Sequence, residues 1–116
     1  MISVEEFEEI LKLYKRHGWE IGRVLASRDL KPLLSSSEAI VRLGNRVTYD
    51  SDIDAIWFFR SRSNGDISWE IRLLSSSPFA LCEAFPPEMP EDRIEQAKRA
   101  MEDRLRGRSS KKNAIT

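Results

Sequence analysis

The sequence predicts an α+β fold with an N-terminal helix, an antiparallel sheet of about four strands and a C-terminal helix. Residues 3–17 repeat apolar side chains at helical spacing, and two runs rich in β-branched and aromatic residues flank Asn64-Gly65. Helical spacing returns after a proline-rich segment near the end of the chain. We interpret residues 1–107 as a single α+β domain and residues 108–116 as a disordered basic tail.

Composition is typical of a soluble, cytoplasmic protein. Of the 116 residues, 41% are hydrophobic, which is enough to form a core without metal or disulfide support. The 19 basic and 19 acidic residues cancel, so net charge does not drive binding to nucleic acid or anionic membranes. Cys82 is the single cysteine, which excludes an intramolecular disulfide and fits a reducing compartment. No apolar run approaches the ~20 residues that span a bilayer.

The first predicted helix begins at a capping box. Ser3 and Glu6 have the S-x-x-E spacing in which each side chain can bond the backbone of the other residue. Gly18 is the predicted end of this helix. A strand over 19–27 follows, and segment 28–43 contains signals for two short helices, the second of which is predicted to end at Gly44. The apolar stripe of the first helix consists of Phe7, Ile10, Leu11 and Tyr14.

The Asn64-Gly65 pair is the strongest local signal, because it favours a two-residue type I′ turn between antiparallel strands. Counting outward from such a turn sets Phe58 opposite Ile71 and Trp57 opposite Arg72. The face that carries Phe58 is nearly all apolar, so we predict that it faces the core. The opposite face mixes aromatic and charged residues.

Residues 79–85 predict one more strand, and the last helix begins after Pro90 with an acidic pair that suits the helix dipole. Gly107 is its predicted end. The apolar stripe of this helix consists of Ile94, Ala97, Met101 and Leu105.

The mixed face of the hairpin carries the candidate interaction residues. Tryptophan, phenylalanine and arginine are enriched at protein interfaces, which favours an exposed binding surface. The alternative is that the last helix or segment 28–43 covers this face. We predict a small non-enzymatic interaction, accessory or regulatory domain that binds a protein partner or a second copy of the chain. The candidate residues are Trp57, Phe59, Glu70 and Arg72.

A small enzyme that uses carboxylates is the first alternative function, with Asp50, Asp52, Asp54 and Glu70 as candidates. The D-x-D-x-D spacing opens a calcium loop. An EF-hand, however, requires Gly and Glu at the positions that Ala55 and Ser61 occupy. We therefore interpret residues 45–52 as a polar connection and predict that the aspartates form a solvated turn, which leads into the central hairpin.

Other chemical sites have little support in the residue inventory. His17 and Cys82 are the only residues of their types, so a nucleophilic pair would require both of them and a Cys/His zinc site cannot form. We predict no catalytic residue, no cofactor and no metal.

Weak binding of nucleic acid through the basic tail is the last alternative. The tail lacks aromatic residues for base stacking, and the acidic start of the last helix would repel phosphate, so nucleic acid is not the predicted partner. The basic residues concerned are Arg104, Arg106, Arg108, Lys111 and Lys112.

Overall fold

The computed structural model describes residues 2–75 and 77–115, with side chains up to residue 108. The helices are α1 (Val4–Arg16), α2 (Lys31–Leu34), α3 (Glu38–Leu43) and α4 (Glu91–Ile115). The strands are β1 (Glu20–Leu25), β2 (Val47–Thr48), β3 (Ala55–Ser61), β4 (Ile67–Leu73) and β5 (Ala80–Phe85). Single 3₁₀ turns cover Arg28–Leu30 and Gly44–Arg46. The α+β class and the helix at each end of the fold are therefore confirmed.

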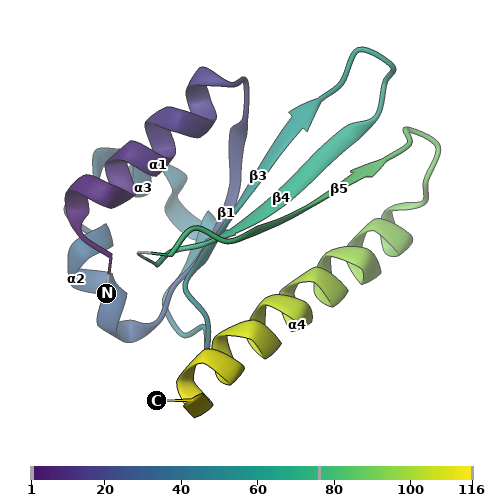
Figure 1. The fold of residues 1–116 in the computed structure, drawn as a ribbon. Coiled ribbons are helices and arrows are strands. Elements are labelled where there is room, and N and C mark those ends of the chain that lie inside the picture. Colours follow the sequence, from purple (N-terminus) through teal and green to yellow (C-terminus); the bar gives the residue numbers. More distant parts are fainter. Residues whose placement is uncertain (1, 76, 116) are drawn as a thin grey trace.

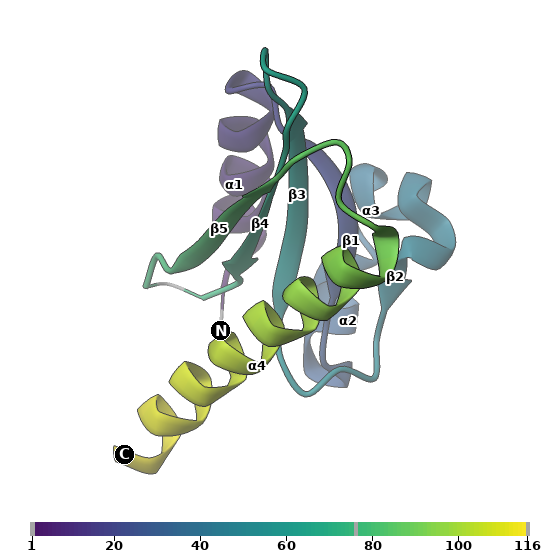
Figure 2. The ribbon, with the colours of Figure 1, turned by 90° about the vertical axis from the view of Figure 1, so that its right-hand side faces the viewer.

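The strands form one sheet in the order β2-β1-β3-β4-β5, with α1, α2 and α3 on one side and α4 on the other (Figures 1 and 2). All neighbouring pairs are antiparallel except β2, which runs parallel to β1. The sheet has five strands where the sequence predicts about four. The additional strand, β2, is only two residues long and lies in the segment that we interpreted as a polar connection.

Helix α1 forms as its sequence predicts. The Ser3 hydroxyl accepts a hydrogen bond from Glu6 N–H at 3.0 Å, and Ser3 N–H donates to the Glu6 carboxylate at 3.2 Å. Gly18 follows the helix with φ +84°, a conformation that side chains with a Cβ rarely adopt. The helix buries Phe7, Ile10 and Tyr14 against the sheet.

The turn between β3 and β4 differs from the prediction. Arg62 N–H donates to the Asp66 carbonyl at 2.8 Å, and Gly65 N–H donates to the Arg62 carbonyl at 3.0 Å. Gly65 has φ +93°, whereas Asn64 does not have a positive φ. This is the pattern of a three-residue loop with a bulge at glycine, which replaces the two-residue type I′ turn. The longer loop shifts the register of β4 by one residue.

The shifted register makes both faces of the sheet apolar in their centres. Phe58 lies opposite Glu70, and Trp57 lies opposite Ile71. The predicted pairs Phe58–Ile71 and Trp57–Arg72 are therefore wrong, because a one-residue slip moves every side chain of β4 to the other face. Phe58 and Ile71 are both buried, as predicted, but on opposite sides of the sheet.

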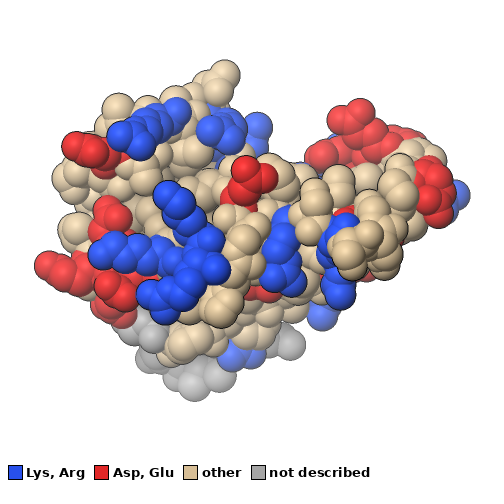
Figure 3. Space-filling model, turned by 90° about the horizontal axis from the view of Figure 1, so that it is seen from above, with Lys and Arg blue, Asp and Glu red and all other residues tan. Residues whose placement is uncertain are grey.

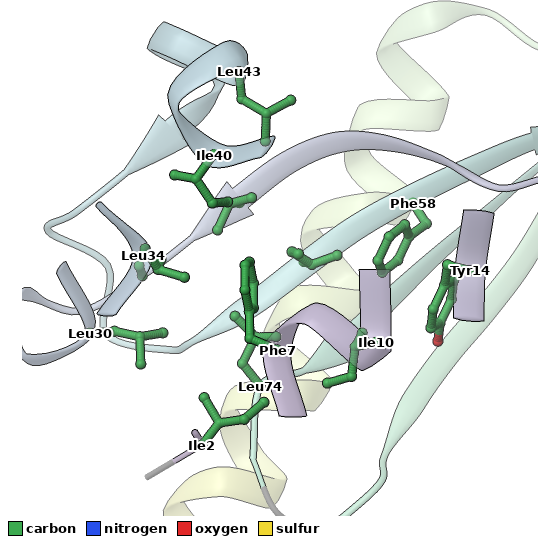
Figure 4. Packing of buried hydrophobic residues seen from close by; sticks show 13 residues of the cluster. Ile2, Phe7, Ile10, Tyr14, Leu30, Leu34, Ile40, Leu43, Phe58 and Leu74 are labelled. Atoms are coloured by element: carbon green, nitrogen blue, oxygen red, sulfur yellow. The ribbon is translucent and has the colours of Figure 1, made fainter. Parts of the chain in front are cut away.

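Each face contributes to its own cluster of buried residues. On the α1 side (Figure 4) the cluster contains Ile2, Phe7, Ile10, Tyr14, Val24, Ala26, Leu30, Leu34, Ile40, Leu43, Ile56, Phe58 and Leu74. On the α4 side it contains Leu25, Ile53, Ala55, Trp57, Ile71, Met101 and Leu105. The alternative in which the last helix covers the second face is therefore the one that forms: α4 lies over the face that the sequence predicted to be an exposed surface.

Helix α4 continues past Gly107 to Ile115. The predicted end at this glycine is wrong, because a single glycine inside a helix costs only ~1 kcal/mol relative to alanine and does not have to stop it. The side chains of residues 109–115, and Thr116, lie outside the described residues. Disorder of the tail over 108–116 therefore stays a prediction.

Candidate binding surfaces

Trp57 is held by α4. Its side chain is 1% exposed, and its indole N–H donates to the Glu102 carboxylate at 2.8 Å. Met101 and Leu105 of the same helix belong to the cluster around it. An indole that is fully covered in this way contributes to the core, and it does not lie on an open surface.

Phe59 lies near Trp57 on the α4 side but is only half-buried. Its ring centroid is 5.0 Å from that of Trp69, and the Lys98 ammonium lies 3.7 Å from the Trp69 centroid. The lysine makes cation–π contacts with Trp69 and, at 5.3 Å, with Trp57. Trp57 and Trp69 therefore pack beneath α4, and Phe59 lies beside Trp69.

Glu70 and Arg72 lie on the other face, facing α1. The Tyr14 hydroxyl donates to the Glu70 carboxylate, and the Arg72 guanidinium lies 6.0 Å from the centroid of the Tyr14 ring. The four predicted interaction residues are thus divided between two sides of the sheet. The predicted grouping of Glu70 and Arg72 with Trp57 is wrong, because the register of β4 is shifted by one residue and its side chains lie on the opposite faces from those predicted.

A cavity of about 350 Å³ lies where α1 ends beside β3 and β4. Tyr14 stacks on Phe58 with a centroid distance of 3.8 Å, and Trp19 meets Tyr14 edge-on at 6.0 Å. The Arg60 guanidinium lies 4.7 Å from the Trp19 centroid and donates to the His17 carbonyl at 3.0 Å. The lining consists of Leu13, Tyr14, His17, Trp19, Arg60, Glu70 and Arg72.

The buried tyrosine of this cavity stays protonated over a wide pH range. Burial and then the hydrogen bond to the Glu70 carboxylate raise the pKa of Tyr14 above its ordinary value, and the neighbouring Arg72 guanidinium only partly opposes them. The hydroxyl therefore acts as a hydrogen-bond donor to Glu70, and it is not a candidate base.

The arginines of the cavity carry positive charge without a partner of opposite charge. Among the described residues, no carboxylate lies within ion-pair distance of Arg60 or Arg72, and Arg72 Nε is a buried donor without an acceptor. On the left half of Figure 3, Lys and Arg side chains lie on the surface with Asp and Glu side chains among them. The last turn of α1 adds Lys15 and Arg16, which are both exposed.

Sequence reasoning missed this cavity. Tyr14 was recognised only as part of an apolar stripe, and Trp19 only as the start of a strand. A buried tyrosine normally finds a partner for its hydroxyl, so a helix stripe that ends in tyrosine was the available signal for a polar contact on the sheet below. Nothing in the sequence identified Glu70 as that partner without the register.

The outer strand β5 presents a second surface, along the edge of the sheet. It pairs with β4 at six consecutive positions without a bulge. Its side chains on the α1 side are small and exposed: Ala80, Cys82 and Ala84. The opposite edge of the sheet differs, because β2 offers only two residues.

Hydrogen bonding fixes which backbone groups of β5 point outward. By the register of the two strands Leu73 lies opposite Phe79, and its N–H donates to the Phe79 carbonyl at 2.9 Å. Hydrogen-bonded pairs alternate with non-bonded pairs along an antiparallel ladder. The alternation directs the N–H and C=O groups of Ala80, Cys82 and Ala84 away from β4, toward the open edge.

The predicted nucleophile candidates do not form a pair. Cys82 lies opposite Glu70 on β5, and no hydrogen bond connects it with His17 among the described residues. Partial burial of the sulfur and the nearby Glu70 carboxylate raise the pKa of the Cys82 thiol. A raised pKa leaves less of the reactive thiolate at neutral pH, so the geometry does not support nucleophilic catalysis.

The three predicted aspartates serve different contacts. Asp54 accepts hydrogen bonds from Ser27 N–H at 2.6 Å and from the Ser27 hydroxyl at 3.3 Å. Asp52 forms an ion pair with Arg106 of α4 at 2.9 Å, and this guanidinium lowers the pKa of the Asp52 carboxyl. Asp50 is exposed. Within the described part of the chain, no group of three or more His, Cys, Asp or Glu side chains is arranged to hold a metal ion.

Searches of known proteins add no assignment. No model of a protein family, no curated protein and no solved structure matches this chain. In the described residues, no helix has both the length and the apolar character needed to cross a membrane. A function for this chain therefore has to be argued from its own geometry.

Proposed function

We propose that this chain is a non-enzymatic interaction domain that binds an extended segment of a partner protein along the outer edge of β5. The open edge of a six-residue, regular strand is the observation that supports this function. An added strand satisfies the unpaired backbone groups of an edge, and its side chains then provide specificity.

The composition of β5 favours this use of its edge. Proteins commonly protect an edge from pairing by a short strand, a lysine, a proline or a bulge. β2 is protected by its shortness, whereas β5 contains none of these four devices between Ala80 and Phe85. Glu83 is its only charged residue. The small side chains on its α1 side leave room for those of an incoming strand.

A proline at Cys82 tests the proposal, because the N–H of this residue points away from β4. Cys82→Pro removes one donor from the open edge and keeps the β4–β5 ladder. The matched control, Cys82→Ala, changes the side chain and keeps the donor. Peptides selected from a random displayed library on the wild-type domain are expected to bind Cys82→Ala equally and to bind Cys82→Pro at least ten-fold more weakly.

Methylation of backbone nitrogens in a selected peptide gives a second measurement that does not depend on the protein variant. Alternate positions should lose binding, since only every second N–H of an added strand faces β5. Equal binding to the proline and alanine variants, together with tolerance of methylation at every position, would refute the proposal. Self-association that disappears only in Cys82→Pro would keep the edge as the site and identify a second copy of the chain as its occupant.

A further inference from the structure

The cavity between the end of α1 and strands β3 and β4 has the chemistry of a ligand site that does not involve the edge of β5. Its volume of about 350 Å³ is near the lower end of the range for small-molecule sites. Leu13, which is 42% exposed, and the partly buried Trp19 provide apolar walls. A site of this size accommodates a small ring or a short aliphatic chain.

The polar groups of the cavity are mostly donors. The Arg72 guanidinium lines the cavity, and its buried Nε has no acceptor among the described residues, so the positive charge of this side chain is not neutralised by an ion pair. Arg60 directs one N–H to the His17 carbonyl at the end of α1, and no other acceptor contacts its guanidinium in the described residues. Glu70 is the single carboxylate of the lining, and it already accepts the Tyr14 hydroxyl.

We propose that this cavity binds a molecule that carries a carboxylate on an apolar or aromatic body. The carboxylate lies against the guanidinium of Arg72, whose two terminal nitrogens donate to its two oxygens, and Arg60 adds a second positive charge. Arginine is suited to this role, because its planar donor pairs match the two oxygens of a carboxylate. The body of the ligand packs on Trp19 and Leu13.

The source of the carboxylate is either a free small acid or the C-terminus of a peptide chain. Both present the same group on an apolar body. They differ in the size of that body, so the cavity can distinguish them only by how much of the ligand fits beyond the carboxylate. Phenylacetate represents the free acid, and N-acetyl-Gly-Phe represents the chain end. Phenylacetamide and the C-terminal amide of N-acetyl-Gly-Phe have nearly the same shapes without the charge.

Titration of ¹⁵N-labelled full-length protein tests the site. Phenylacetate or N-acetyl-Gly-Phe should shift the indole signal of Trp19 and the amide of Gly18, while the indole of Trp57, on the other side of the sheet, stays in place. The neutral amides should bind at least ten-fold more weakly. The tighter of the two acids identifies the source of the carboxylate.

Arg72→Gln should weaken binding of the preferred acid about ten-fold or more, as expected for loss of a charge-assisted donor pair. Arg62→Gln is the matched control, because Arg62 is an exposed arginine on the neighbouring loop and does not line the cavity. Shifts that are equal for acid and amide would overturn the proposal even if Arg72→Gln fails to fold. Acids that leave the cavity signals unchanged, or bind a folded Arg72→Gln as tightly as wild type, would also overturn it.

Discussion

Helices cover the two faces of the sheet to different extents. On the α4 side the buried cluster and its neighbours include residues of β1, β3, β4 and β5, so a single helix covers the centre of this face across four of the five strands. On the α1 side the cluster draws on β1 and β3, with Val47 of β2 against it, while β4 and β5 contribute polar or small residues there. Accessible polar groups therefore lie where the α1 layer does not extend over β4 and β5. The cavity lies on this incompletely covered side, and the small side chains of β5 beside the proposed edge site face the same side.

The largest expected effect comes from removing the central aromatic residue of either face. Trp57→Ala and Phe58→Ala each delete a side chain that is 1% exposed and leave a void, which should lower the free energy of unfolding by ~3–5 kcal/mol. Urea denaturation measures both. Val41→Ala, at a position that is 69% exposed, should change it by less than ~0.5 kcal/mol.

A Trp57→Ala protein as stable as wild type would contradict this difference between the faces, because it would mean that α4 does not cover Trp57. Similar losses for Trp57→Ala and Phe58→Ala would instead support two cores of comparable weight on either side of one sheet.

Local sequence signals predicted the helices well, because their determinants are short in range. The capping box of Ser3 and Glu6 and the glycine after α1 act within one or two turns of the chain. The helix at the end of the chain likewise begins where its acidic first turn predicts, at Glu91. These features need no knowledge of the remaining fold.

The register of the hairpin could not be predicted from the same kind of signal. Asn64-Gly65 is compatible with a two-residue turn and with the longer loop that forms, and the two options differ by one position in β4. The hydrophobic pattern did not decide between them, because both faces of the sheet are buried in their centres. Alternation of apolar and polar residues identifies the core face only when the other face is exposed to solvent. It gives no answer when helices cover both faces.

The candidate site depended on that register and was therefore only partly predicted. Glu70 and Arg72 were singled out by type, and they do line the cavity. Their neighbours were not, since Tyr14 reaches Glu70 from a helix 56 positions away in sequence and Arg60 shares their face only in the register that forms. The parallel pairing of β2 was missed for a related reason: a two-residue strand carries too few residues to show a period.

A change of intermediate size in the free energy of unfolding is expected on the α1 side of the sheet. Tyr14→Phe removes the donor to Glu70 and leaves a partly buried carboxylate with one partner fewer, which should cost ~1–2 kcal/mol at neutral pH. Ring stacking on Phe58 is retained in this variant, so a much larger loss would indicate a repacked core. Thermal and urea unfolding both measure the change.

The same variant has a defined dependence on pH. The pKa of Tyr14 is raised in the folded protein, so the unfolded chain loses the phenol proton first, near its ordinary pKa of about 10. Wild-type stability should therefore be fully present below pH 10 and should fall as the pH rises above it. The difference between wild type and Tyr14→Phe should narrow over that range. A constant difference up to pH 11 would contradict the burial and hydrogen bonding of this hydroxyl.

The smallest expected effect lies at the contact between α4 and the loop before β3. Asp52 pairs with Arg106 at 2.9 Å, but its side chain is 69% exposed, so solvent screening should limit the contribution to ~0.5 kcal/mol or less. Arg106 lowers the pKa of the Asp52 carboxyl. The contribution is therefore present above the ordinary carboxyl pKa and is lost as the pH falls through the lower, folded value.

Asp52→Asn should accordingly be slightly less stable than wild type at pH 7 and low salt, and the two should converge in high salt or strong acid. Asp50→Asn is the control, because Asp50 is exposed and forms no ion pair among the described residues. A loss of more than ~1 kcal/mol in Asp52→Asn that persists in high salt would show that this pair positions α4. The closed face would then depend on a surface ion pair as well as on the apolar contacts of Trp57.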